Sequence, residues 1–204
     1  MNNKIKVFNS VSGQFYGNRK NNIYNEKSYI APQSPYGVSK ASSFWLTKIF
    51  REWYGIKCCS GILFNHESPL RSNEFVTKKI INCGKLIKKG KLKYLCLGNI
   101  NVYRDWGWAP EYVEAMYLML RQKHHRDLVI GTGKRNTLKS FVYEVFRLLN
   151  IPRSSLKTNK KKLIRKRDIR TYKADPKLAK KILKRKAKTS FKQIIYKMVN
   201  EKLY

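Results

Sequence analysis

The sequence predicts an α/β fold built on a parallel sheet. Apolar runs of strand length alternate with segments of helical periodicity along the whole chain. The clearest run, residues 58–64, is apolar-leaning throughout, as expected of a parallel strand buried on both faces. With 204 residues and 42% hydrophobic content, the chain is long enough to bury a core.

The first third contains the most regular pattern. Residues 5–10 are a short strand, and residues 11–17, which contain Ser and Gly, form the loop after it. Residues 36–54 carry apolar side chains at i+3 and i+4 steps, which predicts a long helix ending at Gly55.

The middle of the chain continues the alternation. The strand 58–64 is followed by a loop at residues 65–69, at the strand end where α/β proteins usually bind ligands. A second helix is predicted over 75–87 and a short strand over 93–97.

The last part adds a helix over 110–121, a strand over 128–130 and a helix over 137–149. Gly131 and Gly133 mark a structural turn between the last two. Two further helical stretches in the tail cover residues 176–183 and 191–203.

The charge balance is strongly basic. The chain has 45 Lys plus Arg against 12 Asp plus Glu, a formal net charge of +33. Residues 151–204 hold 20 of the basic and 3 of the acidic residues. Such a surplus first suggests a polyanionic partner such as nucleic acid.

The spacing of the cysteines and the length of the apolar runs indicate which cellular compartment the chain suits. Cys58, Cys59, Cys83 and Cys96 lack the spacing of metal ligands, so no metal site is expected. No apolar run approaches the ~20 residues of a membrane span, and the first residues do not resemble a signal peptide. We therefore expect a reduced, cytoplasmic chain without a membrane partner.

Tyr36 and Lys40 lie one helical turn apart, so both project from the same face of the predicted helix. A nearby cation lowers the pKa of a phenol, which a tyrosine needs in order to act as an acid or base near neutral pH. Ser12 follows the first strand and would bring a hydroxyl to the same end of the sheet. The spacing alone also fits an ordinary surface pair.

The order of Ser12, Tyr36 and Lys40 resembles the catalytic triad of the extended short-chain dehydrogenase/reductase family. Downstream motifs resemble the GDP-mannose 4,6-dehydratases within it. These are GILFNHESP (61–69), Arg71, FVTKKI (75–80), LGN (97–99), RDWG (104–107), YVEAM (112–116), Arg165, Asp168 and ADP (174–176).

The resemblance implies an incomplete Rossmann-like parallel sheet with a smaller C-terminal substrate-binding portion. Residues 1–150 would form the later part of the NAD(P)-binding domain, interleaved with substrate-binding segments. Residues 151–204 would form the basic substrate-binding segment.

The resemblance also implies a reaction, a cofactor and a substrate. The mannosyl C4 hydroxyl of GDP-mannose would be oxidised by bound NADP, water lost across C5 and C6, and the hydride returned to C6. The product is GDP-4-dehydro-6-deoxymannose, and the net reaction is that of a lyase. A homo-oligomer, or pairing with a complete homologue, is expected.

By the same resemblance, Ser12 would bond the C4 oxygen, Tyr36 would take its proton, and Lys40 would bind the nicotinamide ribose and tune Tyr36. His66 and Arg71 match cofactor-contacting positions, which Tyr36 and Lys40 share. The positions that match contacts to the nucleotide sugar are Asn65, Val76, Lys79, Arg104, Arg165 and Asp168.

Two departures from the family pattern stand out. Gln14 replaces a Glu that removes the C5 proton, and a neutral amide cannot accept that proton, which predicts a weak or inactive dehydratase. The Gly-x-x-Gly-x-x-Gly turn that binds the dinucleotide pyrophosphate is absent, so we expect most of the cofactor domain to be missing. A truncated gene, a split gene and a misannotated start remain open.

Two other functions remain open. A basic nucleic-acid-binding protein is suggested by residues 157–170, although the motif register there favours incidental binding. A non-catalytic subunit that pairs with a complete homologue is suggested by Phe44, Trp45 and Trp53 on the Tyr36 helix, for which core packing is the alternative.

Overall fold

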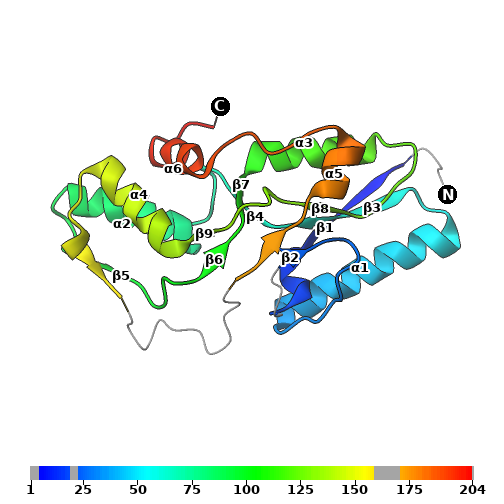
Figure 1. The fold of residues 1–204 in the computed structure, drawn as a ribbon, viewed down its shortest axis with the longest axis horizontal. Coiled ribbons are helices and arrows are strands. Elements are labelled where there is room, and N and C mark those ends of the chain that lie inside the picture. Colours follow the sequence, from blue (N-terminus) through cyan, green and yellow to red (C-terminus); the bar gives the residue numbers. More distant parts are fainter. Residues whose placement is uncertain (1–4, 19–22, 159–170, 204) are drawn as a thin grey trace.

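The computed structural model describes residues 5–18, 23–158 and 171–203. It confirms the α/β class: a parallel sheet with helices on both faces occupies one half of the molecule, and a group of helices occupies the other (Figure 1). None of the helices in the described ranges is long and apolar enough to cross a membrane.

The central sheet has three parallel strands in the order β1, β3, β8. β3 (Cys58–Leu63) lies in the middle and is buried at all six positions, which explains its continuous apolar sequence. β1 (Val7–Ser12) and β8 (Leu128–Ile130) pair on either side of it. β1 extends two residues past the predicted end, so Ser12 is the last residue of the strand.

Each face of the sheet is covered by helices. α1 (Pro35–Tyr54) packs on the face that carries Ile62, with Ala41 and Phe44 in the shared core. The opposite face carries Leu63 and packs against α3 (Ala109–Leu120) and α5 (Lys177–Leu183). Because neighbouring residues of a strand point to opposite faces, β3 supplies both cores.

The predicted helix over residues 36–54 is confirmed as α1, which begins one residue earlier. The Ser34 hydroxyl caps it by accepting a hydrogen bond from the Gly37 N–H (3.0 Å), and Pro35 occupies the first turn. Gly55 ends the helix in the left-handed region, with φ 63°, where glycine has no steric cost.

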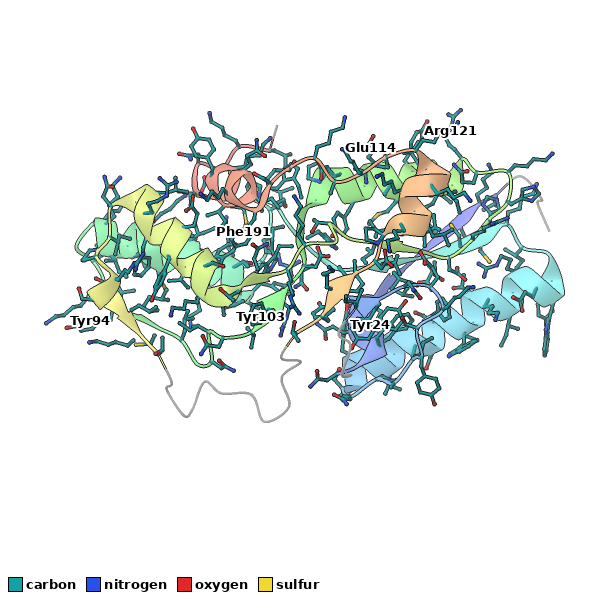
Figure 2. All side chains as sticks on the ribbon, viewed as in Figure 1. Tyr24, Tyr94, Tyr103, Glu114, Arg121 and Phe191 are labelled. Atoms are coloured by element: carbon teal, nitrogen blue, oxygen red, sulfur yellow. The ribbon has the colours of Figure 1, made fainter. Side chains whose placement is uncertain are left out.

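The second half of the molecule is a helical group made of α2 (Val76–Lys88), α4 (Leu138–Leu149) and α6 (Phe191–Val199). They share one core, onto which Phe191, labelled in Figure 2, packs by stacking on Trp106 with ring centres 5.7 Å apart. α6 ends four residues before the predicted end.

The remaining strands form short two-stranded pairs, accompanied by two 3-10 turns. Three pairs are parallel, and only β6 with β9 is antiparallel within the described residues. The pairs are β2 (Ile23–Tyr24) with β11 (Lys173–Ala174), β4 (Asn65–Glu67) with β7 (Trp106–Trp108), β5 (Leu95–Cys96) with β10 (Leu156–Lys157), and β6 (Tyr103–Arg104) with β9 (Asn136–Thr137). The 3-10 turns are η1 (Gly13–Tyr16) and η2 (Arg153–Ser155).

The segment after β3 differs from the predicted loop. Residues 65–67 form β4, which pairs with β7 and so joins the sheet to the helical group. Because β7 is distant from β4 in the sequence, no local sequence pattern predicts that the two strands pair. Asn65 and His66 are therefore held by a strand pair.

The C-terminal segment contributes to both halves, with α5 on the sheet and α6 in the helical group. The connection between them is held by α3: the Glu111 carboxylate accepts hydrogen bonds from the backbone N–H groups of Lys188 and Thr189, both 2.9 Å. The division of the chain at residue 150 stays a prediction.

Candidate active site

Ser12 lies at the carboxyl end of β1, where the strand enters η1. Its hydroxyl accepts a hydrogen bond from the Gln14 N–H (3.3 Å) and so caps the turn. Gln14 is partly buried, and its carbonyl oxygen accepts from the Gly17 N–H (3.2 Å). The Ser12 hydroxyl and the Gln14 residue therefore lie on one short turn.

α1 carries Tyr36 and Lys40 to the same end of the sheet. A Cβ added at Gly37, the residue after Tyr36, would lie 3.4 Å from the Gln14 carbonyl oxygen, so α1 begins directly against η1. The Lys40 ammonium lies 5.8 Å from the centre of the Tyr36 ring, and the Tyr36 side chain is half exposed. The predicted Ser, Tyr and Lys thus come from adjoining elements.

Lys40 also caps the outer edge of β1. Its Nζ donates a hydrogen bond to the Ser10 carbonyl oxygen (2.9 Å). The Val7 N–H points toward β3, where it donates to the Lys57 carbonyl (2.9 Å). The backbone N–H and C=O of successive strand residues point to alternate sides, so the carbonyl of Ser10, three residues later, points away from β3. The ammonium is therefore held at the side of β1 opposite β3.

His66 is fixed in one tautomer by the Phe64 carbonyl group, which directly follows β3. Its Nδ1 lies 2.9 Å from the Phe64 carbonyl oxygen and donates to it, since a carbonyl can only accept. Nε2 is then left as an acceptor. Burial lowers the pKa of His66, which favours this neutral ring, and the ring packs on Tyr112 with centres 4.7 Å apart.

Arg71 is held by a buried carboxylate that the sequence analysis did not single out. Its Nε lies 3.4 Å from Glu67 Oε2, and its guanidinium stacks 3.5 Å from the centre of the Phe75 ring. The Thr77 hydroxyl donates to the same Glu67 oxygen (2.9 Å). Burial raises the pKa of Glu67 to about 7, although Arg71 and Thr77 both favour its ionised form.

Two of the predicted substrate residues, Asn65 and Arg104, meet at Tyr172. The Tyr172 hydroxyl donates to the Asn65 carboxamide oxygen, and the Arg104 guanidinium lies 5.4 Å from the centre of the Tyr172 ring. The Tyr112 hydroxyl donates to the Asn65 backbone carbonyl (3.3 Å). Neither tyrosine was predicted as part of the site.

The other predicted substrate positions divide into two sets. Val76 and Lys79 lie in the first turns of α2, next to the Thr77 that bonds Glu67, and both are exposed. Arg165 and Asp168 lie outside the residues that the structure describes.

Asp105 anchors the turn after β8. Its buried carboxylate accepts hydrogen bonds from the N–H and hydroxyl of Thr132 (2.9 and 2.5 Å), from the Gly133 N–H (2.9 Å) and from the Ala174 N–H (3.2 Å). Burial raises the pKa of Asp105 despite these four donors. Asp105 therefore fixes the segment that follows Tyr172.

Comparison with known proteins points to one family. The family model described as GDP-mannose 4,6 dehydratase matches residues 1–198. The chain is 37% identical to the GDP-mannose 4,6 dehydratase of Dictyostelium discoideum, over 98% of this chain and 61% of the relative. It is 38% identical to GDP-mannose 4,6 dehydratase 1 of Arabidopsis thaliana, over 98% of this chain and 55% of the relative. The chain thus spans little more than half the length of these relatives.

Solved structures show the same fold. A dTDP-glucose 4,6-dehydratase from Bacillus anthracis in complex with NAD matches with a TM-score of 0.85 and 20% identity, over 96% of this chain and 60% of that one. RMD from Pseudomonas aeruginosa complexed with NADPH matches with a TM-score of 0.87 and 18% identity, over 95% and 65%. The partial coverage of those chains fits an incomplete Rossmann-like sheet.

Proposed function

The chain belongs to the GDP-mannose 4,6-dehydratase family, and on that premise we propose that it carries the catalytic and substrate-binding part of a cytoplasmic, NADP-dependent enzyme that converts GDP-mannose to GDP-4-dehydro-6-deoxymannose. The proposal is supported by one observation: α1 packs against both β1 and η1. Ser12 on β1 and Tyr36 and Lys40 on α1 therefore belong to elements that contact one another.

The donor set fits a dinucleotide cofactor. Lys40 and Arg71 supply positive charge, which suits phosphate and ribose oxygens, and His66 Nε2 supplies an acceptor for a hydroxyl. A bound nicotinamide cofactor would accept a hydride from the sugar and later return it. NADP, rather than NAD, rests on the resemblance to the family.

The proton chemistry falls to this chain's own residues. The Ser12 hydroxyl would donate a hydrogen bond to the C4 oxygen, and the Tyr36 phenolate would take the C4 hydroxyl proton. The Lys40 ammonium lies 5.8 Å from the centre of the Tyr36 ring, on the same face of α1. The elimination step then needs a base for the C5 proton, which Gln14 does not provide.

The phosphate and hydroxyl oxygens of the nucleotide sugar would be bound by hydrogen-bond donors of this chain. Arg104 and Lys79 have only N–H donors, which match phosphate and hydroxyl oxygens, and Asn65 adds carboxamide donors. The resemblance assigns Arg165 and Asp168 to the diphosphate and ribose end of the same ligand.

A binding measurement tests the proposed function. Calorimetric titration of the 204-residue chain with GDP-mannose should give saturable binding that UDP-glucose does not match. A folded chain that binds neither GDP-mannose nor GDP overturns the proposal.

Gln14→Glu tests the catalytic assignment. In a complete, cofactor-bound protein that includes the N-terminal cofactor-binding part, restoring the carboxylate should raise the rate of GDP-mannose dehydration by roughly 10²–10⁴-fold, the usual contribution of a general acid or base. The measurement is product formation, followed by mass spectrometry as the loss of one water. Tyr36→Phe in the Gln14→Glu background is the control and should abolish the gain. An unchanged rate in Gln14→Glu would show that the missing carboxylate is not what limits turnover.

A non-catalytic subunit is the second candidate, and the outer face of α1 favours it. Trp45, Leu46, Ile49, Phe50 and Trp53 are all exposed there. We define these five residues as the α1 stripe. Several exposed apolar side chains that lie together on one helix face are typical of an interface with another protein. We propose that the α1 stripe pairs with a second subunit of the family, either another copy of this chain or a complete homologue.

A further inference from the structure

Tyr172 connects two residues that the proposed function assigns to the nucleotide sugar. Its hydroxyl donates to the Asn65 carboxamide oxygen, and its ring lies 5.4 Å from the Arg104 guanidinium. The side chain is 3% exposed and packs on Phe64, with ring centres 5.0 Å apart. Tyr172 therefore lies beneath Asn65 and Arg104 rather than on the surface.

The hydrogen bond decides which way the Asn65 amide faces. A carboxamide has an acceptor oxygen on one branch and two N–H donors on the other. Because the Tyr172 hydroxyl donates to the oxygen, the N–H branch points away from Tyr172. Arg104 also has only donors, so both residues are set to bind acceptor oxygens, such as those of phosphates and sugar hydroxyls.

The backbone on both sides of Tyr172 is anchored. Thr171 forms a parallel bridge with Tyr103, the neighbour of Arg104. On the other side, Ala174 pairs with Tyr24 in the β11–β2 pair, and its N–H donates to the buried Asp105. The ring is therefore fixed relative to Arg104 by the backbone as well as by packing.

We propose that Tyr172 is a positioning residue of the nucleotide-sugar site: through its hydroxyl it orients the Asn65 carboxamide with its N–H donors toward the ligand, and its ring supports Arg104. This inference rests on the proposed function and adds a residue to that site. Tyr172 itself does not touch the reacting atoms.

Tyr172→Phe tests the role of the hydroxyl. The substitution keeps the ring and its packing but removes the only group that orients the Asn65 oxygen among the described residues. The dissociation constant for GDP-mannose, measured by calorimetry on the 204-residue chain, should rise about tenfold, equivalent to about 1.4 kcal/mol.

Tyr24→Phe is the matched control. Tyr24, labelled in Figure 2, is also a buried tyrosine, and its hydroxyl donates to the Gly17 carbonyl (3.0 Å). Both variants lose one buried hydroxyl, so both should lower the free energy of unfolding, but Tyr24→Phe should leave the dissociation constant unchanged. Equal effects on binding in the two variants would overturn the positioning role.

A double-mutant cycle shows whether Tyr172 acts through Asn65. Asn65→Ala should weaken binding, and Tyr172→Phe should then add little to it, because the group that it positions is gone. Fully additive effects overturn the inference while leaving the proposed function intact. If the folded wild-type chain binds neither GDP-mannose nor GDP, the proposed function fails and the site role of Tyr172 with it.

Discussion

Two buried carboxylates, Glu67 and Asp105, show how the surroundings of a residue set its chemistry. Asp105 is bonded by three backbone N–H groups and one hydroxyl, and it serves to hold a turn. Glu67 has one hydroxyl donor and the Arg71 Nε at 3.4 Å. Burial raises the pKa of both carboxyl groups, that of Glu67 to about 7.

Glu67 should make stability depend on pH. Its pKa is raised in the folded chain, so the folded state binds the proton more tightly than the unfolded state does, and stability falls as pH rises from about 4.5 to about 7. Relative to Glu67→Gln, the wild-type chain should lose roughly 3 kcal/mol of unfolding free energy across this window. Urea denaturation at a series of pH values measures the difference.

Glu144→Gln is the control for this experiment because the pKa of Glu144 is lowered in the folded chain, whereas that of Glu67 is raised. Hydrogen bonds from Arg147 lower the pKa of Glu144, so its contribution to stability is present at neutral pH and is lost as pH falls below about 4.5. A stability difference between wild type and Glu67→Gln that does not vary between pH 4.5 and 7 would contradict the assigned burial of Glu67.

At the scale of elements, the turn after β8 shows how close packing selects a glycine. A Cβ added at Gly131 would lie 2.3 Å from the Ala174 Cβ of β11 and 3.3 Å from Asp105 Oδ2. β8 and β11 can approach in this way only because one of the two residues has no side chain. The structural turn predicted at Gly131 and Gly133 thus also holds the strand that follows Tyr172.

Exchanging the two small residues tests this contact. Gly131→Ala should destabilise the chain by roughly 1–3 kcal/mol, the usual cost of overpacking. Adding Ala174→Gly removes the opposing methyl group, so the double variant should be more stable than Gly131→Ala alone. Urea denaturation of the two single variants and the double variant gives the coupling. If Gly131→Ala is as stable as wild type, the close approach of β8 and β11 is wrong.

Over the whole molecule, α1 separates a packed face from an exposed one. Phe44 lies in the core against Phe15, with ring centres 5.5 Å apart, so core packing accounts for it. Trp45 and Trp53 are 47% and 76% exposed and belong to the α1 stripe. α1 lies along the outer side of the sheet in Figure 1, where a second subunit has access to it.

The net charge of +33 distinguishes no partner beyond incidental polyanion binding.

Charges in the α1 stripe should dissociate the proposed assembly. Leu46→Glu with Trp53→Glu places two carboxylates in the interface and should convert a dimer to a monomer in analytical ultracentrifugation. Val113→Glu on α3 is the control, because Val113 is 61% exposed but lies outside the α1 stripe. A monodisperse wild-type monomer that also fails to co-purify with a complete homologue would contradict the interface.

The sequence by itself determined the α/β class, the buried strand β3, the helix α1 with its ends, and the order of Ser12, Tyr36 and Lys40. These signals are local: apolar periodicity and a terminal glycine act within a few residues of one another. The roles of the individual site residues stay predictions.

Only the tertiary structure decided what surrounds those residues. The β4–β7 pair, the burial of Glu67 beside Arg71, and the bond between Tyr172 and Asn65, 107 positions apart, have no signature in either local segment. Hydrogen-bond partners and burial depend on which segments the fold brings together, and a single sequence does not specify that pairing locally. Burial and long-range pairing therefore place Glu67 beside Arg71 and Tyr172 beside Asn65.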